Sequence, residues 1–514
     1  MSKNTLRVAL TGLVVGIVTA ANAATVPDYQ ASSHWFTDGQ ASVSEKSALS
    51  REDVTAKNVI LFVGDGMGIS TLTAARILQG QQAGEEGEEN LLSFEAFPYS
   101  ALIKTYNTNQ QTPDSAGTMT AMMSGVKNKA GMLNIGSDGL RADCASSKGN
   151  EMATFLDLME SEGRATGVVS TARITHATPA ATYARIAERN WESDDALTDE
   201  ARSNGCKDIA DQLVSYGIGD GIDVVLGGGR RHFITADEGG KRTDGRDLTA
   251  EWQEKYPQGV YVETGSELAA IDPTATDKLM GLFAASHMSY ETDRVASGAD
   301  EPSIADMTGT AIDVLSKNDN GYFLMVESGR VDHAHHAGNA YNALNDAIAL
   351  SDAVQAAVDK VNLEDTLILV TADHSHVFTI AGYPTKGNPI LGKVVGNDAS
   401  GAAESTPVLA ADDMPYTTLG YTNGLGFADL GTETDADVRY GSAGDNGRKD
   451  LSAVDTQTPG FHQEALIPLG SETHAGEDIS LHAIGAASYL VQGNVEQSTL
   501  FHLMTRATAV SPAE

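Results

Sequence analysis

The sequence has 514 residues, of which 41% are hydrophobic, and it carries 34 lysine and arginine residues against 70 aspartate and glutamate residues. The formal net charge is −36, and the hydrophobic content suits a folded rather than a disordered chain. A protein this acidic repels phosphate backbones and anionic lipids, so no nucleic-acid-binding surface is expected. The excess acid favours a strongly hydrated, halophilic surface, with an ordinary acidic secreted protein as the alternative.

The N-terminus predicts a signal for export. Lys3 and Arg7 precede a mostly apolar run at 8–18, and the small residues that a signal peptidase recognises follow at 21–23. We expect residues 1–23 to be a signal peptide, and residues 24–514 to be periplasmic or secreted with no membrane anchor after cleavage. The apolar run is too short for a membrane span, although an uncleaved N-terminal anchor is the alternative.

Export also bears on the two cysteines, Cys144 and Cys206. Two cysteines cannot form a disulfide scaffold or a cysteine-based zinc array. Because disulfides persist outside the cytoplasm, we expect one bridge that stabilises the fold by about 2–5 kcal/mol. Two separate buried thiols are the alternative.

Three short apolar runs predict buried strands at 58–63, 322–326 and 366–370, and each run ends in polar residues. Helical spacing is seen elsewhere along the chain, at 70–79, 115–123, 151–162, 303–316 and 339–361. This alternation predicts an α/β fold, in which ligands gather at the carboxyl ends of the strands. Composition predicts surface loop and helix at 236–257, and an insertion that leaves the sheet at about 381–470.

The strongest functional signal follows the second predicted strand, where two carboxylates and three imidazoles lie within ten residues: Glu327, Asp332, His333, His335 and His336. Zinc accepts both ligand types, and Asp332 and His336 share one face if a helix begins there. Asp373 and His374 repeat the pairing after the third strand, and Asp65 lies in a glycine-rich turn after the first. We expect a metal centre, with a surface cluster, or a turn role for Asp65, as the alternative.

A candidate nucleophile, Ser115, lies at the start of a predicted helix. Pro113 ends the preceding segment, so the hydroxyl lies where amide donors and the helix dipole favour an anion. The sequence has no Gly-x-Ser-x-Gly motif to supply a hydrolase serine, and a metal can activate a serine hydroxyl without a histidine base. An ordinary helix cap is the alternative.

Together these motifs resemble the alkaline phosphatases. The resemblance rests on six segments that match in order and spacing: 63–68, 114–118, 176–180, 327–336, 371–376 and 472–478. It is closer to the animal-type and marine bacterial branch than to the enteric branch, because His176 and His333 stand where the enteric pattern has Asp and Lys. The spacing of Cys144 and Cys206 also resembles an animal-type disulfide.

The resemblance implies an architecture for residues 24–514. The expected fold is a three-layer α/β/α sandwich with a large, mostly parallel central sheet and a crown-like insertion at about 381–470. A homodimer is implied as well, with the insertion as a candidate interface element.

The resemblance also implies two zinc ions and one magnesium ion per subunit. The first zinc would be held by Asp332, His336 and His474. The second zinc would be held by Asp65, Asp373, His374 and Ser115. The magnesium would be held by Asp65, His176, Thr178 and Glu327.

Roles for other residues follow from the same resemblance. Arg189 would hold phosphate, with Arg185 as the nearby competitor. Asp114 and His333 would contact the ligands or the phosphate-binding residues without binding metal themselves, whereas His335 and His376 would be structural.

The implied function is hydrolysis of small-molecule phosphate monoesters at alkaline pH, through a phosphoserine on Ser115. A planar guanidinium such as that of Arg189 can hold two phosphate oxygens, which favours a dianionic monoester over a diester. Three alternatives stay open from the residues alone: a two-zinc phosphodiesterase or sulfatase, a periplasmic zinc- or phosphate-binding protein, and an acidic adhesin.

Overall fold

The computed structural model describes residues 37, 54–441 and 445–510. The expected signal peptide at 1–23 lies outside this range. The described residues from 54 to 510 form one compact unit. Among the described helices, none combines the length and the apolar character needed to span a bilayer.

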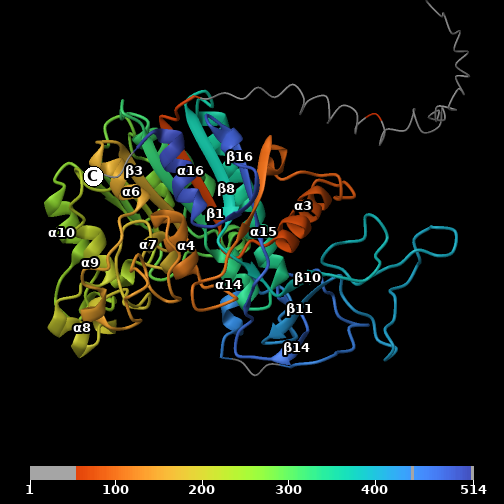
Figure 1. The fold of residues 1–514 in the computed structure, drawn as a ribbon. Coiled ribbons are helices and arrows are strands. Elements are labelled where there is room, and N and C mark those ends of the chain that lie inside the picture. Colours follow the sequence, from red (N-terminus) through yellow and green to blue (C-terminus); the bar gives the residue numbers. More distant parts are fainter. Residues whose placement is uncertain (1–36, 38–53, 442–444, 511–514) are drawn as a thin grey trace, which may run out of the picture. The chain divides into compact units, whose positions relative to one another are not determined.

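A ten-stranded sheet forms the centre of this unit (Figure 1), in the order β17-β2-β16-β8-β1-β7-β3-β4-β6-β5. All neighbours are parallel except β16, which runs antiparallel to both β2 and β8. The strands are β1 (Asn58–Gly64), β2 (Tyr99–Lys104), β3 (Ala165–Arg173), β4 (Val224–Gly228), β5 (Val260–Val262), β6 (Leu279–Leu282), β7 (Tyr322–Ser328), β8 (Thr366–Ala372), β16 (Ile479–Gly485) and β17 (Gly493–Glu496).

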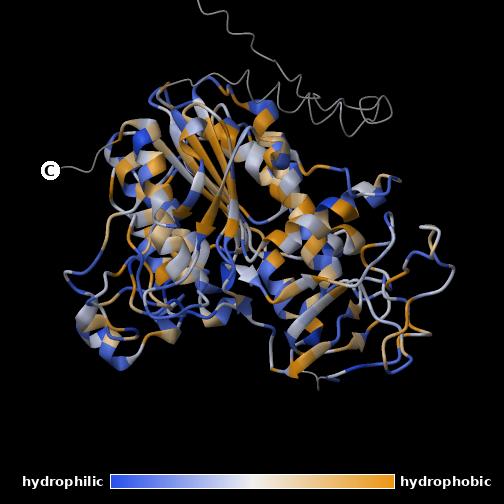
Figure 2. Cartoon of the chain, turned by 45° about the vertical axis from the view of Figure 1, so that its right-hand side comes forward, coloured by the Kyte–Doolittle hydropathy of each residue, from blue (hydrophilic) through white to orange (hydrophobic). Residues whose placement is uncertain are grey.

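The three strands predicted from apolar runs are β1, β7 and β8, and they lie side by side. Val59 of β1 pairs with Phe323 of β7 on one side and with Leu367 of β8 on the other. All but the first residue of β1, and every residue of β7 and β8, are buried, which explains their continuously apolar sequences. Figure 2 shows these central strands as hydrophobic.

Helices cover both faces of the sheet, so the expected three-layer α/β/α sandwich is confirmed. On one face α3 (Ile69–Gln82) and α13 (Ile304–Leu315) pack around α15 (Ala340–Lys360). On the other face α4 (Ser115–Ser124), α6 (Phe155–Ser161) and α16 (Thr499–Thr508) pack together. The predicted helices match within a few residues, except that α6 starts four residues late because Thr154 caps it by accepting a hydrogen bond from the main chain of Asp157.

Shorter helices occupy the connections: α5 (Cys144–Ser147), α7 (Ala177–Ala180), α8 (Asp199–Asn204), α9 (Ile209–Val214), α10 (Leu248–Lys255), α11 (Gly265–Ala269), α12 (Glu291–Ser297) and α14 (Arg330–His336). Part of the stretch at 236–257 is more buried than its polar composition predicts. Arg242 is 1% exposed there, because Asp208 and Asp244 neutralise its guanidinium.

The described residues of 381–470 contribute no strand to the central sheet. They supply β11 (Leu419–Gly424) and β14 (Ala465–Pro468) to a three-stranded sheet with β10 (Phe378–Ile380), and they form the pair β12 (Ala428–Asp429) and β13 (Phe461–His462). The chain then returns through β15 (His474–Ala475), which pairs antiparallel with β9 (Ser375–His376). This pairing brings the histidine-containing segment at 472–478 beside the end of β8.

Cys144 and Cys206 form a disulfide, as predicted, with their Cα atoms 6.1 Å apart. The bridge joins the start of α5 to the residue that follows α8 and its Gly205 cap. It closes a loop with a sequence separation of 62 residues.

Candidate metal centre and active site

The candidate centre forms where β1, β7 and β8 end at the same edge of the sheet. Asp65 follows β1, Glu327 lies near the end of β7, and Asp373 follows β8. After β1 the chain turns at Gly66, which has φ +68°, and a Cβ added there would lie 2.3 Å from Nε2 of His376. Only glycine therefore lets this turn pass beside His376 without strain or overlap.

The first group consists of Asp332, His336 and His474. Oδ1 of Asp332 lies 3.3 Å from Nε2 of His336 and 3.3 Å from Nε2 of His474, and the two nitrogens are 3.1 Å apart. A tetrahedral zinc with bonds of about 2.0–2.2 Å separates its ligands by about 3.3–3.6 Å. The three atoms therefore fit three corners of a zinc site.

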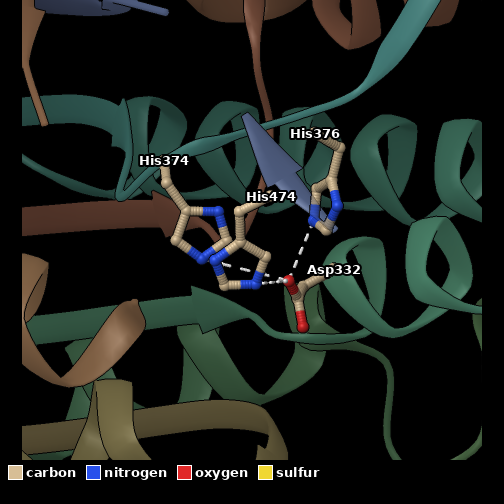
Figure 3. Close-up of side chains that lie close together, drawn as sticks. All are labelled: Asp332, His374, His376 and His474. Atoms are coloured by element: carbon tan, nitrogen blue, oxygen red, sulfur yellow. Dashed lines mark hydrogen bonds and ion pairs between the residues drawn. The ribbon is translucent and has the colours of Figure 1, made fainter. Parts of the chain in front are cut away.

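The second group surrounds Nε2 of His374. Oδ1 of Asp65 lies 3.3 Å from this nitrogen, Oδ2 of Asp373 lies 3.4 Å from it, and Oγ of Ser115 lies 3.1 Å from it. These spacings again match the edges of a zinc tetrahedron. The two groups adjoin, because Asp332 Oδ1 is 3.9 Å from the same nitrogen (Figure 3).

The third group lies on the other side of Asp65. Asp65, His176 and Glu327 offer ligand atoms that all lie within 4.8 Å of one another. Oγ1 of Thr178 is 3.4 Å from Oδ2 of Asp65, so the two oxygens of Asp65 face different groups. The donors are mainly oxygens, as a divalent cation such as magnesium prefers, with one imidazole.

Four buried polar atoms in these groups have no hydrogen-bond partner: Asp65 Oδ1, Glu327 Oε1, His176 Nδ1 and His374 Nδ1. Leaving a buried polar atom unpaired costs about 1–3 kcal/mol. Bound cations would satisfy both carboxylate oxygens. The donor set therefore fits metal ions.

Crowding of acids supports the same conclusion. Burial, then Asp373 and Asp332, raises the pKa of Asp65 well above its usual range. Burial, opposed in part by a hydrogen bond from Ser170, raises the pKa of Glu327 to about 8. These carboxylates lack compensating positive charge, which cations at the three groups would supply.

Burial favours the neutral form of two imidazoles of the site, those of His374 and His176, and a neutral imidazole is the form that binds a metal. Burial, with His474 as the next cause, lowers the pKa of His374 well below its usual range. Burial, with Arg189 as the next cause, does the same for the pKa of His176. Hydrogen bonds fix ring orientation in the first group, since Nδ1 of His336 lies 2.7 Å from the Glu472 carbonyl oxygen and Nδ1 of His474 lies 2.8 Å from that of Pro113.

Ser115 is the first residue of α4, and it is 2% exposed. Asp114 caps the helix by accepting a hydrogen bond from the main-chain N–H of Gly117 at 3.1 Å. The helix cap expected as an alternative role for Ser115 therefore exists, but Asp114 supplies it and leaves the Ser115 hydroxyl free to face His374. The positive end of the helix dipole also favours negative charge at this position.

Arg189, and not Arg185, reaches the candidate site. Its guanidinium lies 3.3 Å from Oδ2 of Asp114 and 3.2 Å from Nε2 of His176. Arg185 instead forms an ion pair with Asp157 and donates to the carbonyl oxygens of Met152 and Tyr183.

His333, which was expected to support the site, and His335, which was expected to be structural, lie beside the ligand groups. The ring of His333 is 5.4 Å from that of His176, measured between centroids, so His333 flanks the third group. His335 points away from the site, and its nitrogens lie 2.9 Å from Oγ1 of Thr71 and 2.7 Å from the hydroxyl of Tyr421.

Sequence reasoning missed the part that His376, Glu472 and His287 play around the site. Nε2 of His376 is 2.8 Å from Oδ1 of Asp332, and its Nδ1 is 2.6 Å from Oε2 of Glu472. The ring of His287 is 4.0 Å from that of His333. The clue for His376 and Glu472 was their place beside Asp373-His374 and His474, whereas the position of His287 gave none.

A family model described as alkaline phosphatase matches residues 56–510. The chain belongs to the alkaline phosphatase family. Tissue-nonspecific alkaline phosphatase of Gallus gallus is 43% identical over 471 residues, which cover 89% of this chain and 85% of the relative. The Homo sapiens enzyme of the same name is 39% identical over 516 residues, covering 97% and 93%. The predicted family is therefore confirmed.

Solved alkaline phosphatases share the fold of this one. The Thermus thermophilus structure has a TM-score of 0.62 at 23% identity and covers 95% of this chain and 96% of its own. The structure from the Antarctic bacterium TAB5 has a TM-score of 0.59 at 22% identity, covering 89% and 100%. With its family and fold established, the chain is an alkaline phosphatase, a hydrolase of phosphate monoesters.

Proposed function

We propose that this alkaline phosphatase works with two zinc ions and one magnesium ion per subunit and through a phosphoserine on Ser115. The observation that carries the proposal is the position of the Ser115 hydroxyl oxygen, 3.1 Å from Nε2 of His374 in a group whose spacing fits zinc. Asp332, His336 and His474 would hold the first zinc. Asp65, Asp373, His374 and Ser115 would hold the second zinc. Asp65, His176, Thr178 and Glu327 would hold magnesium.

Ser115 is placed to attack phosphorus. The bound metals would supply positive charge that lowers the pKa of the serine hydroxyl and of water and stabilises the oxygens that enter and leave. The N-terminus of α4 adds amide donors near the same hydroxyl. Attack by Ser115 Oγ breaks the ester bond and forms phosphoserine, and water then attacks its phosphorus and releases phosphate. Because both attacking oxygens must lose a proton, an alkaline optimum is expected.

The leaving group departs toward the first group of ligands. His336 and His474 have side-chain exposures of 23% and 14%, whereas those of Asp65 and His374 are 0%. The site therefore opens to solvent at the first group. An alcohol that leaves on this side would depart toward the more exposed ligands, which supports a broad range of small-molecule phosphate monoesters and a role in phosphate scavenging.

Arg189 would hold two non-bridging oxygens of the substrate. Asp114 supports this role because its carboxylate lies 3.3 Å from the guanidinium and accepts hydrogen bonds from Gly131 and Asn107. Asp114 thus fixes the position of Arg189 and leaves the rest of its fork for phosphate. A phosphate diester has one non-bridging oxygen and one negative charge fewer than a dianionic monoester, so it should bind to Arg189 less well.

Several further properties are proposed from the sequence. The chain would be exported by the signal at 1–23 to the periplasm or the exterior, and its net charge of −36 would suit a saline medium. It would act as a homodimer, with residues 381–470 as the crown-like interface element.

The test is hydrolysis of a chromogenic phosphate monoester, beside its diester and sulfate analogues, before and after chelation. Monoester turnover that chelation removes and zinc plus magnesium restore is the expected result. Acid quenching during turnover of a labelled monoester should trap phosphate on Ser115. A preference for the diester or the sulfate, or turnover without covalent label, would refute the proposal.

A further inference from the structure

Glu472 is a buried carboxylate to which the proposed function gives no role. It is 2% exposed and lies where the chain returns from residues 381–470 to the sheet edge. Its main chain packs against Gly424 of β11, which has φ +136°, and a Cβ added to that glycine would lie 3.2 Å from Cβ of Glu472. The position of Glu472 is therefore tightly restricted.

The carboxylate of Glu472 binds the segment that follows β8. Its Oε1 accepts a hydrogen bond from the main-chain N–H of Val377 at 2.8 Å, and its Oε2 lies 2.6 Å from Nδ1 of His376. The other nitrogen of His376 lies 2.8 Å from Oδ1 of Asp332. Both nitrogens of His376 therefore already have carboxylate partners, Glu472 on one side and Asp332 on the other, which occupies them with hydrogen bonds rather than with a metal ion.

The main chain of Glu472 holds a second residue of the same group. Its carbonyl oxygen lies 2.7 Å from Nδ1 of His336, and its N–H donates to the His336 carbonyl oxygen at 3.0 Å. Nε2 of His336 is therefore directed at Asp332. Glu472 thus reaches Asp332 through His376, and it reaches His336 directly.

We propose that Glu472 is a positioning residue for the first metal: it holds His376, which orients Asp332 and is itself kept out of coordination. The proposal rests on the proposed assignment of Asp332, His336 and His474 to that metal. Asp332, His374, His376 and His474 lie close enough together to hold one metal ion (Figure 3). The proposal excludes His376 from the ligands in this group. Orienting groups of this kind change metal affinity or activity by about 10–100-fold.

The test is a cobalt titration of the metal-free protein, followed by visible absorption. The absorption lost in His474→Ala defines the first site. Glu472→Ala should weaken cobalt binding there by about 10–100-fold, and His376→Ala should do the same. The double variant should be no weaker than His376→Ala, because Glu472 acts on Asp332 through His376. Glu472→Gln keeps the volume, but with its oxygen on the Val377 N–H it presents an amide NH2 group to Nδ1 of His376, so it should also lower cobalt affinity, although by less than Glu472→Ala.

A matched control is Glu160→Gln, because Glu160 is also 2% exposed but lies in α6, where it accepts a hydrogen bond from Thr166 at the start of β3, at the opposite end of the strands. It should leave first-site absorption unchanged. The proposal is overturned if Glu472→Ala and Glu472→Gln both keep wild-type affinity, or if the losses of the two single variants multiply. It is also overturned if Glu472→Ala loses a metal while first-site absorption persists, because Glu472 would then be a ligand itself.

Zinc-dependent turnover by the wild-type protein distinguishes failure of the proposed function from failure of this proposal. If it shows no zinc-dependent monoester turnover, the proposed function fails, whatever Glu472 does. If it does show this turnover, the cobalt data on the variants decide the positioning role. Thermal unfolding of each variant shows whether it folds. If Glu472→Ala does not fold, the cobalt affinity of Glu472→Gln is compared with that of wild type instead.

Discussion

The hydroxyl oxygen of Ser115 lies 3.1 Å from Nε2 of His374, although the two residues are 259 positions apart in the sequence. The contact joins the start of α4 to the residue after Asp373 at the end of β8. It places the proposed nucleophile among the ligands of the proposed second zinc. Removing the hydroxyl should therefore separate chemistry from metal binding.

Ser115→Ala should lower kcat for monoester hydrolysis by about 10³-fold or more, because the variant loses the oxygen that lies 3.1 Å from Nε2 of His374. Metal content should stay close to wild type, since Asp65, Asp373 and His374 remain. Ser124→Ala is the matched control, because Ser124 lies in the same helix and donates to the Thr120 carbonyl oxygen at 2.8 Å. Equal activity in Ser115→Ala and wild type would contradict the phosphoserine route.

Asp65→Ala should disturb two metal sites at once. Oδ1 of Asp65 faces His374, and Oδ2 faces Thr178, so one carboxylate serves the second and the third groups. Thr178→Val removes a donor from the third group alone, so it is the control with which Asp65→Ala is compared. Elemental analysis after limited dialysis should show loss of both zinc and magnesium in Asp65→Ala, but of magnesium only in Thr178→Val. Loss of one metal in both variants would show that Asp65 does not bridge.

Arg189→Lys should raise KM for the monoester by about 10–100-fold, because a lysine cannot reproduce two charge-assisted hydrogen bonds from one planar group. Competitive inhibition by inorganic phosphate should weaken by a similar factor. Arg185→Lys serves as the control. Its guanidinium is bonded to Asp157 and main-chain oxygens, so it should affect thermal stability and leave KM unchanged. The reverse pattern would reassign phosphate binding to Arg185.

Replacing both cysteines by alanine should lower the unfolding free energy by about 4 kcal/mol, as expected for a cross-link between residues 62 positions apart in the sequence. The bridge joins the start of α5 to the residue after the Gly205 cap of α8, and neither cysteine belongs to the three ligand groups, so turnover at low temperature should persist. Thermal unfolding with and without reductant measures the effect. Wild type treated with reductant should approach the double variant, and a wild-type midpoint that reductant leaves unchanged would argue against the bridge.

Much of the fold was predictable because its central strands are buried on both faces. β1, β7 and β8 carry uninterrupted apolar sequences, and each ends in the acids that form the site. Parallel strands place their carboxyl ends at one edge, so the clustering of Asp65, Glu327 and Asp373 follows from the pattern alone.

The remainder of the site depends on pairing that no local pattern encodes. His376 and Glu472 meet because β9, which ends at His376, pairs with β15, which begins at His474, and a single sequence does not show this register. His287 reaches His333 from the loop after β6 for the same reason. Arg242 was expected near the surface because its sequence neighbours are polar, whereas acids from other segments allow its burial.

Asp346 predicts a dependence of stability on pH that is independent of the metals. Its carboxyl group is 2% exposed in α15, and burial, opposed in part by Arg330, raises its pKa to about 8. In the unfolded chain an aspartate has a pKa near 3.9, so between these values the folded state binds more protons than the unfolded state. The contribution of Asp346 to the unfolding free energy therefore falls as pH rises through this window, by up to about 1.4 kcal/mol per pH unit, and levels off above pH 8.

Asp346→Asn removes this proton and should therefore gain stability relative to wild type as pH increases from 5.5 to 8. The asparagine can still accept the hydrogen bond that the main-chain N–H of Glu291 donates to Asp346 at 3.3 Å. Unfolding midpoints of both metal-loaded proteins, measured across this range, give the difference directly. Asp319→Asn, at an exposed position, should show a constant difference. Because the other titratable groups are the same in wild type and variant, a stability difference that stays constant with pH for Asp346→Asn would mean that Asp346 is ionised in the folded protein throughout.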